Sequence, residues 1–272
     1  MKPENMKQPL VSVIMPTYNH ARFIGEAIGS VLNQTYPNLE LIIIDNYSED
    51  NTEEIVSSYK NQRVKYFKFR NHGVIAASRN YGMRHAQGDY IAFLDSDDLW
   101  EPTKIGKQVQ LLEEDEEYFL VYTAYKVINK GVECKVLPKR KHKKSGIIFI
   151  PLFLSYNFIG LSTVVFRNVS KEDVFIFDTD IELRAVEDYD LWLRIAKNKQ
   201  IAYIDEPLAV YRVHGQNTSD GIISYIFRNL KVTRKYQRDV NRALLIIKYF
   251  LIFMTVCLLM IKKLYTRNEV TK

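Results

Sequence analysis

Short apolar runs alternate with segments of helical periodicity through the first hundred residues. The runs are rich in β-branched residues and lack the apolar–polar alternation of a half-exposed strand, so they predict strands buried on both faces. Between them, apolar side chains recur at the three- and four-residue spacing of an amphipathic helix. The predicted strands are 10–15, 39–44, 64–69 and 90–94, and the predicted helices are 22–34, 52–60 and 73–86. This alternation predicts right-handed crossovers and an α/β fold with a mostly parallel central sheet flanked by helices.

The second half of the chain has a less regular pattern. A helix ending in an acidic run is predicted first, and the turn residues Asn129–Gly131 indicate a hairpin. Pro207 separates two further apolar runs, which we interpret as two short strands. The remaining predicted strands are 121–127, 132–137, 161–167, 201–205 and 208–213, and the predicted helices are 102–117 and 187–197. Because no repeat or linker interrupts this pattern, we predict one domain over residues 1–225.

A basic and apolar tail follows at residues 226–272. Residues 228–272 hold 11 Lys and Arg against two acids, a local charge of +9, whereas the whole chain carries +6. The stretch from Ala243 to Ile261 contains a single charge, Lys248. A bilayer span needs about 20 apolar residues, so a span in which Lys248 snorkels, an in-plane anchor and a dimer contact all remain open. We expect a helical membrane anchor whose cationic residues face anionic lipid.

Composition narrows the classes of protein. A hydrophobic content of 47% and a charged content of 26% indicate a folded core. Cys134 and Cys257 lie far apart without metal-ligand spacing, which fits a reducing compartment. No apolar signal core follows the first lysines. The basic residues flank an apolar run and do not interleave with aromatic residues, so we expect a membrane surface as a partner and no nucleic acid.

Polar clusters follow three of the predicted strands, at Pro16–Asn19, Asp45–Ser48 and Asp95–Asp98. In an open parallel sheet, ligands bind outside the carboxyl ends of the strands. Solubility alone does not explain three such clusters at one edge. The pattern therefore indicates a binding site at this edge.

The cluster Asp95–Asp98 contains three carboxylates in four residues. These charges repel one another unless a cation or solvent offsets them, and Mg²⁺ or Mn²⁺ prefers oxygen ligands of this kind. The competing interpretation is a helix N-cap before Pro102. A cap needs one Asp, so we favour a divalent cation as the cofactor.

Glycine-rich phosphate loops are missing. A dinucleotide-binding enzyme has a glycine-rich turn after its first strand, whereas this chain has Pro16–Arg22 there, and it has no P-loop sequence. A cation must then hold any phosphates, which agrees with the acidic cluster.

Several of these segments, in this order, resemble family 2 glycosyltransferases of the GT-A fold, of the type that builds bacterial surface polysaccharides. The resemblance covers about residues 10–215. It is carried by Val13–Asn19, Ser30–Tyr36, Ile44–Thr52, Ala77–Gly82, Gly88–Asp98, Glu187–Trp192 and Tyr211–His214.

The resemblance implies an inverting transfer of one sugar from a nucleotide diphosphate donor, most simply a UDP-sugar, to a glycan or lipid-linked acceptor. It implies a nucleotide site formed by Thr17, Tyr18, Asn19, Asp45, Arg79 and Asp95, with Asp45 accepting the uracil N–H. It implies Asp97 as the metal ligand, with Asp95 near the cation, and Asp188 as the general base. Asn46 departs from the family, which usually has a second Asp there, and we expect that position to be peripheral.

Three further residues have competing interpretations. Glu187 and Asp188 precede a helix, where acidic side chains also favour the helix dipole. Glu187 and Trp192 are candidates for the acceptor site, although Trp192 also fits a core position. His214 is a candidate metal ligand, and a structural role is the alternative.

Two other classes of function remain at this point. A nucleotidyltransferase shares a sheet and a metal site but needs a glycine-rich basic loop, and a membrane-tethered glycan-binding module needs neither Asp97 nor Asp188. A processive synthase carries a Gln-x-x-Arg-Trp segment, which is absent. We therefore expect a metal-dependent glycosyltransferase at the cytoplasmic face of the cell membrane.

Overall fold

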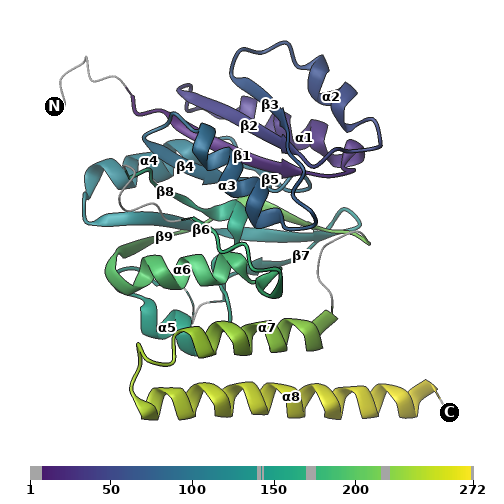
Figure 1. Cartoon of the computed structure of the whole chain (residues 1–272), viewed down its shortest axis with the longest axis vertical. Helices are drawn as coiled ribbons and strands as arrows, with labels where there is room; N and C mark the ends of the chain where they lie inside the picture. Colours follow the sequence, from purple (N-terminus) through teal and green to yellow (C-terminus); the bar gives the residue numbers. More distant parts are fainter. Residues whose placement is uncertain (1–7, 140–141, 143, 170–175, 216–220, 271–272) are drawn as a thin grey trace.

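In the computed structural model of the chain, four parallel strands form the N-terminal half of one sheet (Figure 1). The structure describes residues 8–139, 142, 144–169, 176–215 and 221–270. Of these, residues 221–223 and 259–270 are described by their backbone alone. The strand order is β3-β2-β1-β4, as the alternating pattern predicts for crossover units. These strands are β1 (Val11–Thr17), β2 (Leu39–Asp45), β3 (Val64–Lys68) and β4 (Tyr90–Phe93).

Every residue of β1 and β2 is buried, which explains their unbroken apolar runs. The two strands pair in register, so that Thr17 lies opposite Asp45 at their carboxyl ends. Helices cover both faces. The side of β1 that carries Val13 packs against α1 and α4, and the opposite side, which carries Ile14, faces α3, α5 and α6. The helices are α1 (Ala21–Leu32), α2 (Thr52–Ser58), α3 (Ile75–His85), α4 (Lys104–Glu114), α5 (Phe149–Leu154) and α6 (Glu187–Asn198).

The C-terminal half of the sheet is mixed, which corrects the expectation of a mostly parallel sheet. The order continues β4-β8-β6-β9-β5, with β4–β8, β6–β8 and β5–β9 antiparallel and β6–β9 parallel. The predicted hairpin is confirmed, since β7 pairs antiparallel with β6. The strands are β5 (Leu99–Trp100), β6 (Tyr118–Asn129), β7 (Val132–Leu137), β8 (Val165–Arg167) and β9 (Gln200–Val213).

Two predicted short strands are one long strand, β9. Pro207 lies within it, at an irregularity in the register between β6 and β9. A proline is tolerated inside a strand at such a bulge, because no ladder hydrogen bond is required of it there. The strand therefore continues past Pro207 and carries His214 to the edge where β4 ends.

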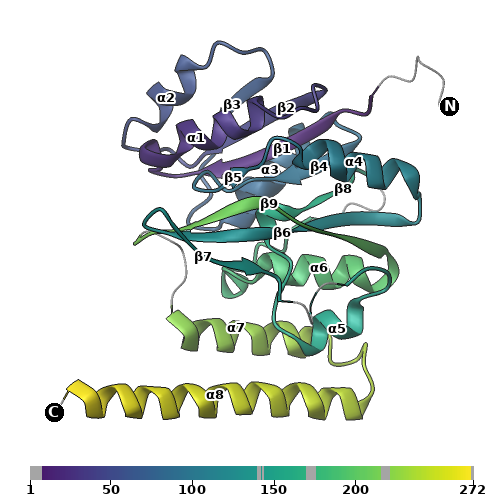
Figure 2. The ribbon, with the colours of Figure 1, turned by 180° about the vertical axis from the view of Figure 1, so that it is seen from behind.

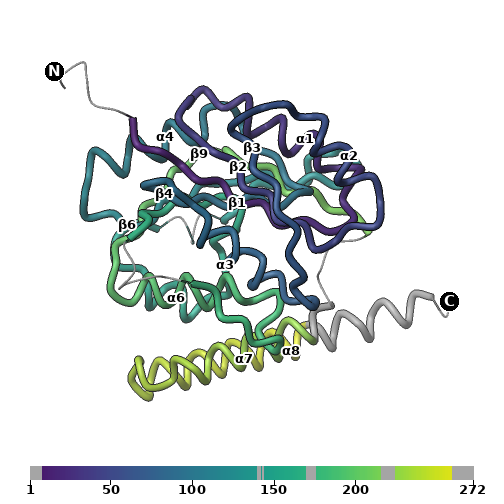
Figure 3. Tube along the Cα trace, turned by 45° about the horizontal axis from the view of Figure 1, so that its top comes forward, coloured from purple at the N-terminus to yellow at the C-terminus, as the bar shows by residue number. Residues whose placement is uncertain are grey.

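Two long helices close the chain, α7 (Gly221–Lys235) and α8 (Arg242–Val270). They run side by side in opposite directions, with α7 nearer to α6 and α8 outermost (Figures 1, 2 and 3). Val232 and Tyr236 are buried in the same hydrophobic cluster as Trp192, and the Tyr236 hydroxyl donates to the backbone oxygen of Asp190 at 2.9 Å. The start of the tail is thus packed on the α/β body.

Lys248 does not snorkel towards solvent or lipid, which corrects our expectation for the tail. It is 1% exposed, and its ammonium donates to the backbone oxygen of Ser155 at 2.7 Å. Two of the basic residues that we predicted to face lipid form ion pairs within the protein, Lys231 with Glu182 and Lys235 with Asp178. Within the part of the chain that the structure describes, no helix combines the length and apolar character needed to cross a bilayer.

Candidate active site

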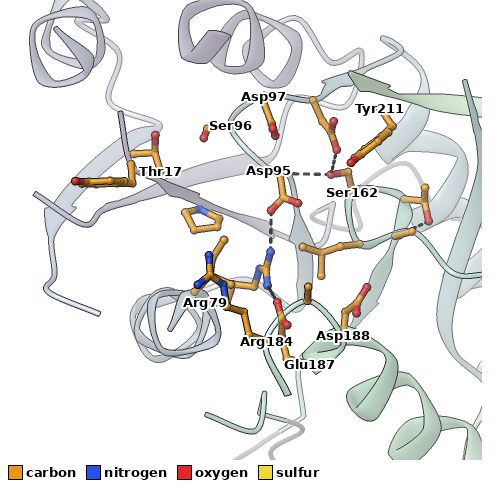
Figure 4. Close-up of a pocket in the computed structure, with 18 of the residues that line it drawn as sticks. Thr17, Arg79, Asp95, Ser96, Asp97, Ser162, Arg184, Glu187, Asp188 and Tyr211 are labelled. Atoms are coloured by element: carbon orange, nitrogen blue, oxygen red, sulfur yellow. Dashed lines mark hydrogen bonds and ion pairs between the residues drawn. The ribbon is translucent and has the colours of Figure 1, made fainter. Parts of the chain in front are cut away.

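A cavity of about 840 Å³ opens at the carboxyl ends of β1 and β4. Polar and charged side chains from both halves of the chain line it, and Figure 4 draws many of them and labels the main ones. The lining includes Thr17, Tyr18, Arg79, Asp95, Asp97, Asn157, Ser162, Arg184, Glu187, Asp188, Tyr211, Tyr225 and Arg228. The predicted binding edge is therefore hollow, and the start of α6 and part of α7 form its far wall.

The acidic turn after β4 meets the end of β9. The Oδ2 atom of Asp97 lies 2.9 Å from Nε2 of His214, so the structure brings together two residues that are 117 positions apart. The His214 ring stacks on Phe23, with centroids 4.4 Å apart, and His20 contacts Ser96 at 2.7 Å. His214 is held beside the acidic turn by these contacts, as its candidate role requires.

Burial and mutual repulsion raise the pKa values of the other two carboxyl groups of this turn, Asp95 and Asp98. Burial, reinforced by Asp97 and Asp95, raises the pKa of Asp98 well above its usual range, although Ser162 donates to Asp98 at 2.6 Å. Burial also raises the pKa of Asp95, while Arg79 opposes this rise. A bound cation would offset this repulsion, so the oxygen donors and the imidazole fit Mg²⁺ or Mn²⁺. Among the described residues, no three His, Cys, Asp or Glu side chains are grouped closely enough to form a complete metal cage.

Arg79 joins the two halves of the cavity. It is 4% exposed and donates to Asp95 at 2.9 Å and to Glu187 at 2.6 Å (Figure 4). Burial disfavours its charge, but the two carboxylates raise the pKa of Arg79 above its ordinary value. Glu187, a candidate acceptor residue, is 6% exposed and serves this buried ion pair. Arg79 therefore links the acidic turn to the first turn of α6.

Asp188 lies beside Glu187 and faces the cavity. Burial, followed by the repulsion of Glu187, raises the pKa of Asp188 to about 7. Its Oδ2 atom accepts a hydrogen bond from the amide of Asn157 at 2.8 Å, and its Oδ1 atom accepts from the backbone N–H of Tyr189 at 2.7 Å. The residue before α6 is Val186, and no side chain caps that helix. A carboxyl group with a pKa near neutrality in a cavity suits general acid–base chemistry.

The end of β1 supplies the predicted nucleotide residues. Thr17 and Tyr18 line the cavity, and the buried Oγ1 atom of Thr17 has no hydrogen-bond partner. Tyr18 is 47% exposed, which leaves its ring accessible to a ligand. Asn19 has a left-handed backbone (φ 52°) and its side chain accepts from the backbone N–H of Glu49 at 2.7 Å. Asn19 thus ties the ends of β1 and β2 together and does not line the cavity.

Asp45 is fully buried at the end of β2. Its carboxylate accepts hydrogen bonds from the hydroxyls of Ser48 and Tyr66, both at 2.6 Å. A base can reach it only if this turn opens, and its contact with uracil stays a prediction. The neighbouring Asn46 lines the cavity and accepts from the backbone N–H of Asn71 at 2.9 Å, so it is not peripheral as we expected.

Trp192 is fully buried and does not line the cavity, which corrects its assignment to the acceptor site. Its ring packs in the hydrophobic cluster with Phe177, at a centroid distance of 6.5 Å. Trp192 lies about one helical turn after Asp188. It nevertheless belongs to the apolar face of α6, which packs inward onto the sheet.

Sequence reasoning assigned no site role to several residues that line the cavity. Asn157 lies in a segment without a predicted element, whereas Ser162 and Tyr211 lie within the predicted strands 161–167 and 208–213. Arg184 precedes Ala185, a non-glycine residue with φ 62°, and such backbone strain is concentrated at functional sites. Asn157 and Arg184 belong to no periodic pattern. The only available signal was their polarity within otherwise apolar surroundings.

Comparisons with known proteins identify the family of the chain. The family model described as Glycosyl transferase family 2 matches residues 12–173, more than half of the chain. An uncharacterized glycosyltransferase of Rickettsia typhi is 31% identical over 226 residues, which cover 82% of this chain and 70% of that protein. The Escherichia coli protein WfaP, a UDP-Glc:alpha-D-GlcNAc-diphosphoundecaprenol beta-1,3-glucosyltransferase, is 31% identical over 247 residues, or 89% of this chain and 93% of WfaP.

Solved structures share the fold at low identity. Staphylococcus aureus TarS (residues 1–349) in complex with UDP-GlcNAc has a TM-score of 0.70 and 19% identity, covering 87% of this chain and 70% of that one. Mannosyltransferase PcManGT from Pyrobaculum calidifontis, in complex with GDP-Man and Mn²⁺, has a TM-score of 0.62 and 20% identity, covering 90% and 70%. The mixed α/β arrangement is thus that of GT-A-like glycosyltransferases.

Proposed function

The chain belongs to glycosyl transferase family 2 and is a glycosyltransferase, and from this premise we propose that it transfers one sugar, with inversion, from a UDP-sugar to a hydroxyl of a lipid-linked glycan. The position of Asp188 carries the proposal, because this carboxyl group faces the cavity with a pKa near 7. WfaP is named for a UDP-sugar donor and a diphosphoundecaprenol-linked acceptor, which supports both substrate classes.

Asp188 acts as the general base in this proposal. The acceptor hydroxyl attacks the anomeric carbon on the face opposite the diphosphate, and its proton passes to the Asp188 carboxylate. The new C–O bond forms as the bond to the leaving diphosphate oxygen breaks, which inverts the configuration. Such general-base assistance contributes about 10²–10⁴-fold to the rate.

In this proposal Asp97 would hold the divalent cation together with the oxygens of the donor diphosphate, with Asp95 and His214 as the neighbouring candidate ligands, because no three described side chains form a metal cage by themselves. When bound, Mn²⁺ or Mg²⁺ supplies positive charge that stabilises the departing diphosphate. The donor set of carboxylate oxygens with one imidazole supports either ion, and PcManGT was solved with Mn²⁺. Arg79 is already paired with Asp95 and Glu187, so it orients these carboxylates and contributes little free charge.

Thr17 and Tyr18 bind the uridine of the donor. The unpartnered hydroxyl of Thr17 offers a hydrogen bond, and the exposed ring of Tyr18 offers a stacking surface. The competing base is guanine, which is larger and presents a different edge. Competition titrations test this point, since stronger inhibition by GDP than by UDP would exclude the uridine assignment.

The outward face of α8 lies in the plane of the cytoplasmic membrane surface. Its inner face carries Lys248 and the buried Ile252 against the body, so the first half of the helix cannot leave the body to span a bilayer. Between residues 244 and 258, the exposed side chains of α8 are apolar and recur at helical spacing, and basic residues precede them, as in an interfacial anchor. These side chains are Ile246, Ile247, Phe250, Leu251, Phe253, Met254 and Leu258.

The function is tested by measuring UDP release from a panel of UDP- and GDP-sugars in the presence of Mn²⁺. A lipid diphosphate sugar serves as the acceptor, and product configuration is read by NMR. We expect one UDP-sugar to give acceptor-dependent release of UDP and an inverted product. A retained configuration, or release only from GDP-sugars, would refute the proposal.

A further inference from the structure

The segment Ser155–Asn157 lies between Asp188 and the C-terminal helices. At one end, the amide of Asn157 donates to Oδ2 of Asp188 at 2.8 Å. At the other end, the backbone oxygen of Ser155 accepts from Lys248 at 2.7 Å and from the Tyr189 hydroxyl at 3.3 Å. Two residues of chain therefore connect the ammonium of α8 to the carboxylate that the proposed reaction uses.

Lys248 is costly to bury. Among the described residues it forms no ion pair; its ammonium lies over the ring of Tyr156 at 5.3 Å and over those of Phe153 and Tyr189 at 5.8 Å. Burial lowers the pKa of Lys248 to about 8. A Leu or Met at this position would fill the space without that desolvation cost. The lysine is therefore explained by its hydrogen bond to Ser155 more readily than by packing.

The helix α7 holds the same segment from a second side. Tyr225 of α7 and Tyr156 of the segment are both half-buried. The rings of Tyr156 and Tyr225 also contact, with centroids 6.1 Å apart. Both C-terminal helices thus contact the segment that contains Asn157, whose side-chain amide donates to Asp188.

We propose that Lys248 is a positioning residue, which sets the orientation of the Asp188 carboxylate by holding Ser155–Asn157 against α8. The inference rests on the proposed role of Asp188 as the base. It gives the C-terminal helix a part in the chemical step in addition to any part in anchoring. The rate of transfer to the acceptor then depends on the position of α8. Binding of the donor in the half of the cavity around Thr17 and Asp97 does not depend on that position.

The test is Lys248→Met, which keeps the length of the side chain and removes the donor to Ser155. We expect kcat for transfer to fall at least about tenfold, because small misplacements of a catalytic group are expensive. The KM for the donor and the affinity for UDP, measured by calorimetry, should stay unchanged. Lys197→Met is the matched control, since Lys197 is an exposed lysine of α6 that pairs with Asp239, outside this segment. Wild-type kcat in Lys248→Met would overturn the inference.

A double-mutant cycle separates positioning from loss of structure. If Lys248 acts through Asp188, Lys248→Met should have no further effect on kcat in an Asp188→Asn background. An equal fall in both backgrounds would overturn the inference. Should Lys248→Met fail to fold, as thermal unfolding would reveal, Tyr225→Leu removes the ring contact of α7 with the segment and must give the same cycle. Wild-type turnover in Asp188→Asn alone would instead overturn the proposed function, and this inference with it.

Discussion

The guanidinium of Arg79, on α3, lies 2.6 Å from the carboxylate of Glu187, on α6, and both side chains are buried. The same guanidinium reaches Asp95, at the end of β4, at 2.9 Å. One side chain thereby fixes the start of α6 relative to the acidic turn. The distance between the candidate base and the candidate metal residues depends on this bridge.

Replacing Arg79 with Met should lower the free energy of unfolding by about 3–5 kcal/mol, because the buried Glu187 and the partly exposed Asp95 lose their counter-charge. Urea denaturation measures this loss. Arg84→Met, on the exposed side of the same helix, is the control and should change stability by less than about 0.5 kcal/mol. Equal stability of the two variants would show that the buried bridge is not needed for the fold.

Asp188→Asn should keep donor affinity and lower turnover at least about a hundredfold, as expected for the loss of a general base. Asp190→Asn is the contrasting variant on α6, since Asp190 is fully buried and bonded to Arg194, Lys235 and Tyr236. It should lose stability more than turnover at saturating substrate. If Asp188→Asn instead lost only stability, Asp188 would be a structural residue of the helix start.

The rate of transfer should rise with pH through about 7 and level off above about 8. The base accepts a proton only when ionised, and burial places the pKa of Asp188 at about 7. Below that pH the rate should fall about tenfold per unit, as for a single essential carboxylate. The pH profile of kcat checks this. A profile that stays flat down to pH 5 would contradict the raised pKa.

Chelation should abolish transfer, and added Mn²⁺ or Mg²⁺ should restore it. Asp97→Ala should lose nearly all transfer and should not be restored by added metal, because its carboxylate faces the cavity beside His214. Asp180→Ala is a control, since Asp180 is exposed and lies outside the cavity. Full activity of the wild type in excess chelator would exclude the cation.

The double variant Phe250→Ser and Phe253→Ser should weaken binding to anionic vesicles about 10–100-fold, since burial of each ring contributes roughly 1.5–3 kcal/mol when complete. Vesicle sedimentation measures this, and a high-salt wash separates insertion from charge attraction. Val132→Ser on β7, where the side chain is also exposed, should have no effect. Wild-type protein that stays in the supernatant at low salt would contradict the anchor. Surface substitutions are preferable to deletion from Arg242, because deletion also removes Lys248.

Local sequence determined the elements of the N-terminal half and the kind of chemistry at their ends. The runs of β1, β2 and β4 are continuous because both faces of these strands are buried, and their periodicity needs no tertiary information. The motifs at Thr17, Asp95–Asp97 and Asp188 carried the resemblance to the family; the first two follow buried strands and the third lies in the first turn of α6. The model of the family confirms that assignment over residues 12–173.

Only the tertiary structure decided which residues meet, because those contacts join segments far apart in the chain. Asp97 meets His214 across 117 residues, since β9 continues past Pro207 at a bulge that periodicity does not reveal. Trp192 is a core residue because the apolar face of α6 packs on the sheet.

Asn157 and Lys248 show the same limit most clearly. Asn157 belongs to an irregular segment without a pattern, and Lys248 reads as an interruption in an apolar helix. Sequence alone therefore suggested that the lysine turns outward, where its charge is solvated. The structure turns it inward, because the carbonyl of Ser155 and the surrounding aromatic rings replace water around its ammonium.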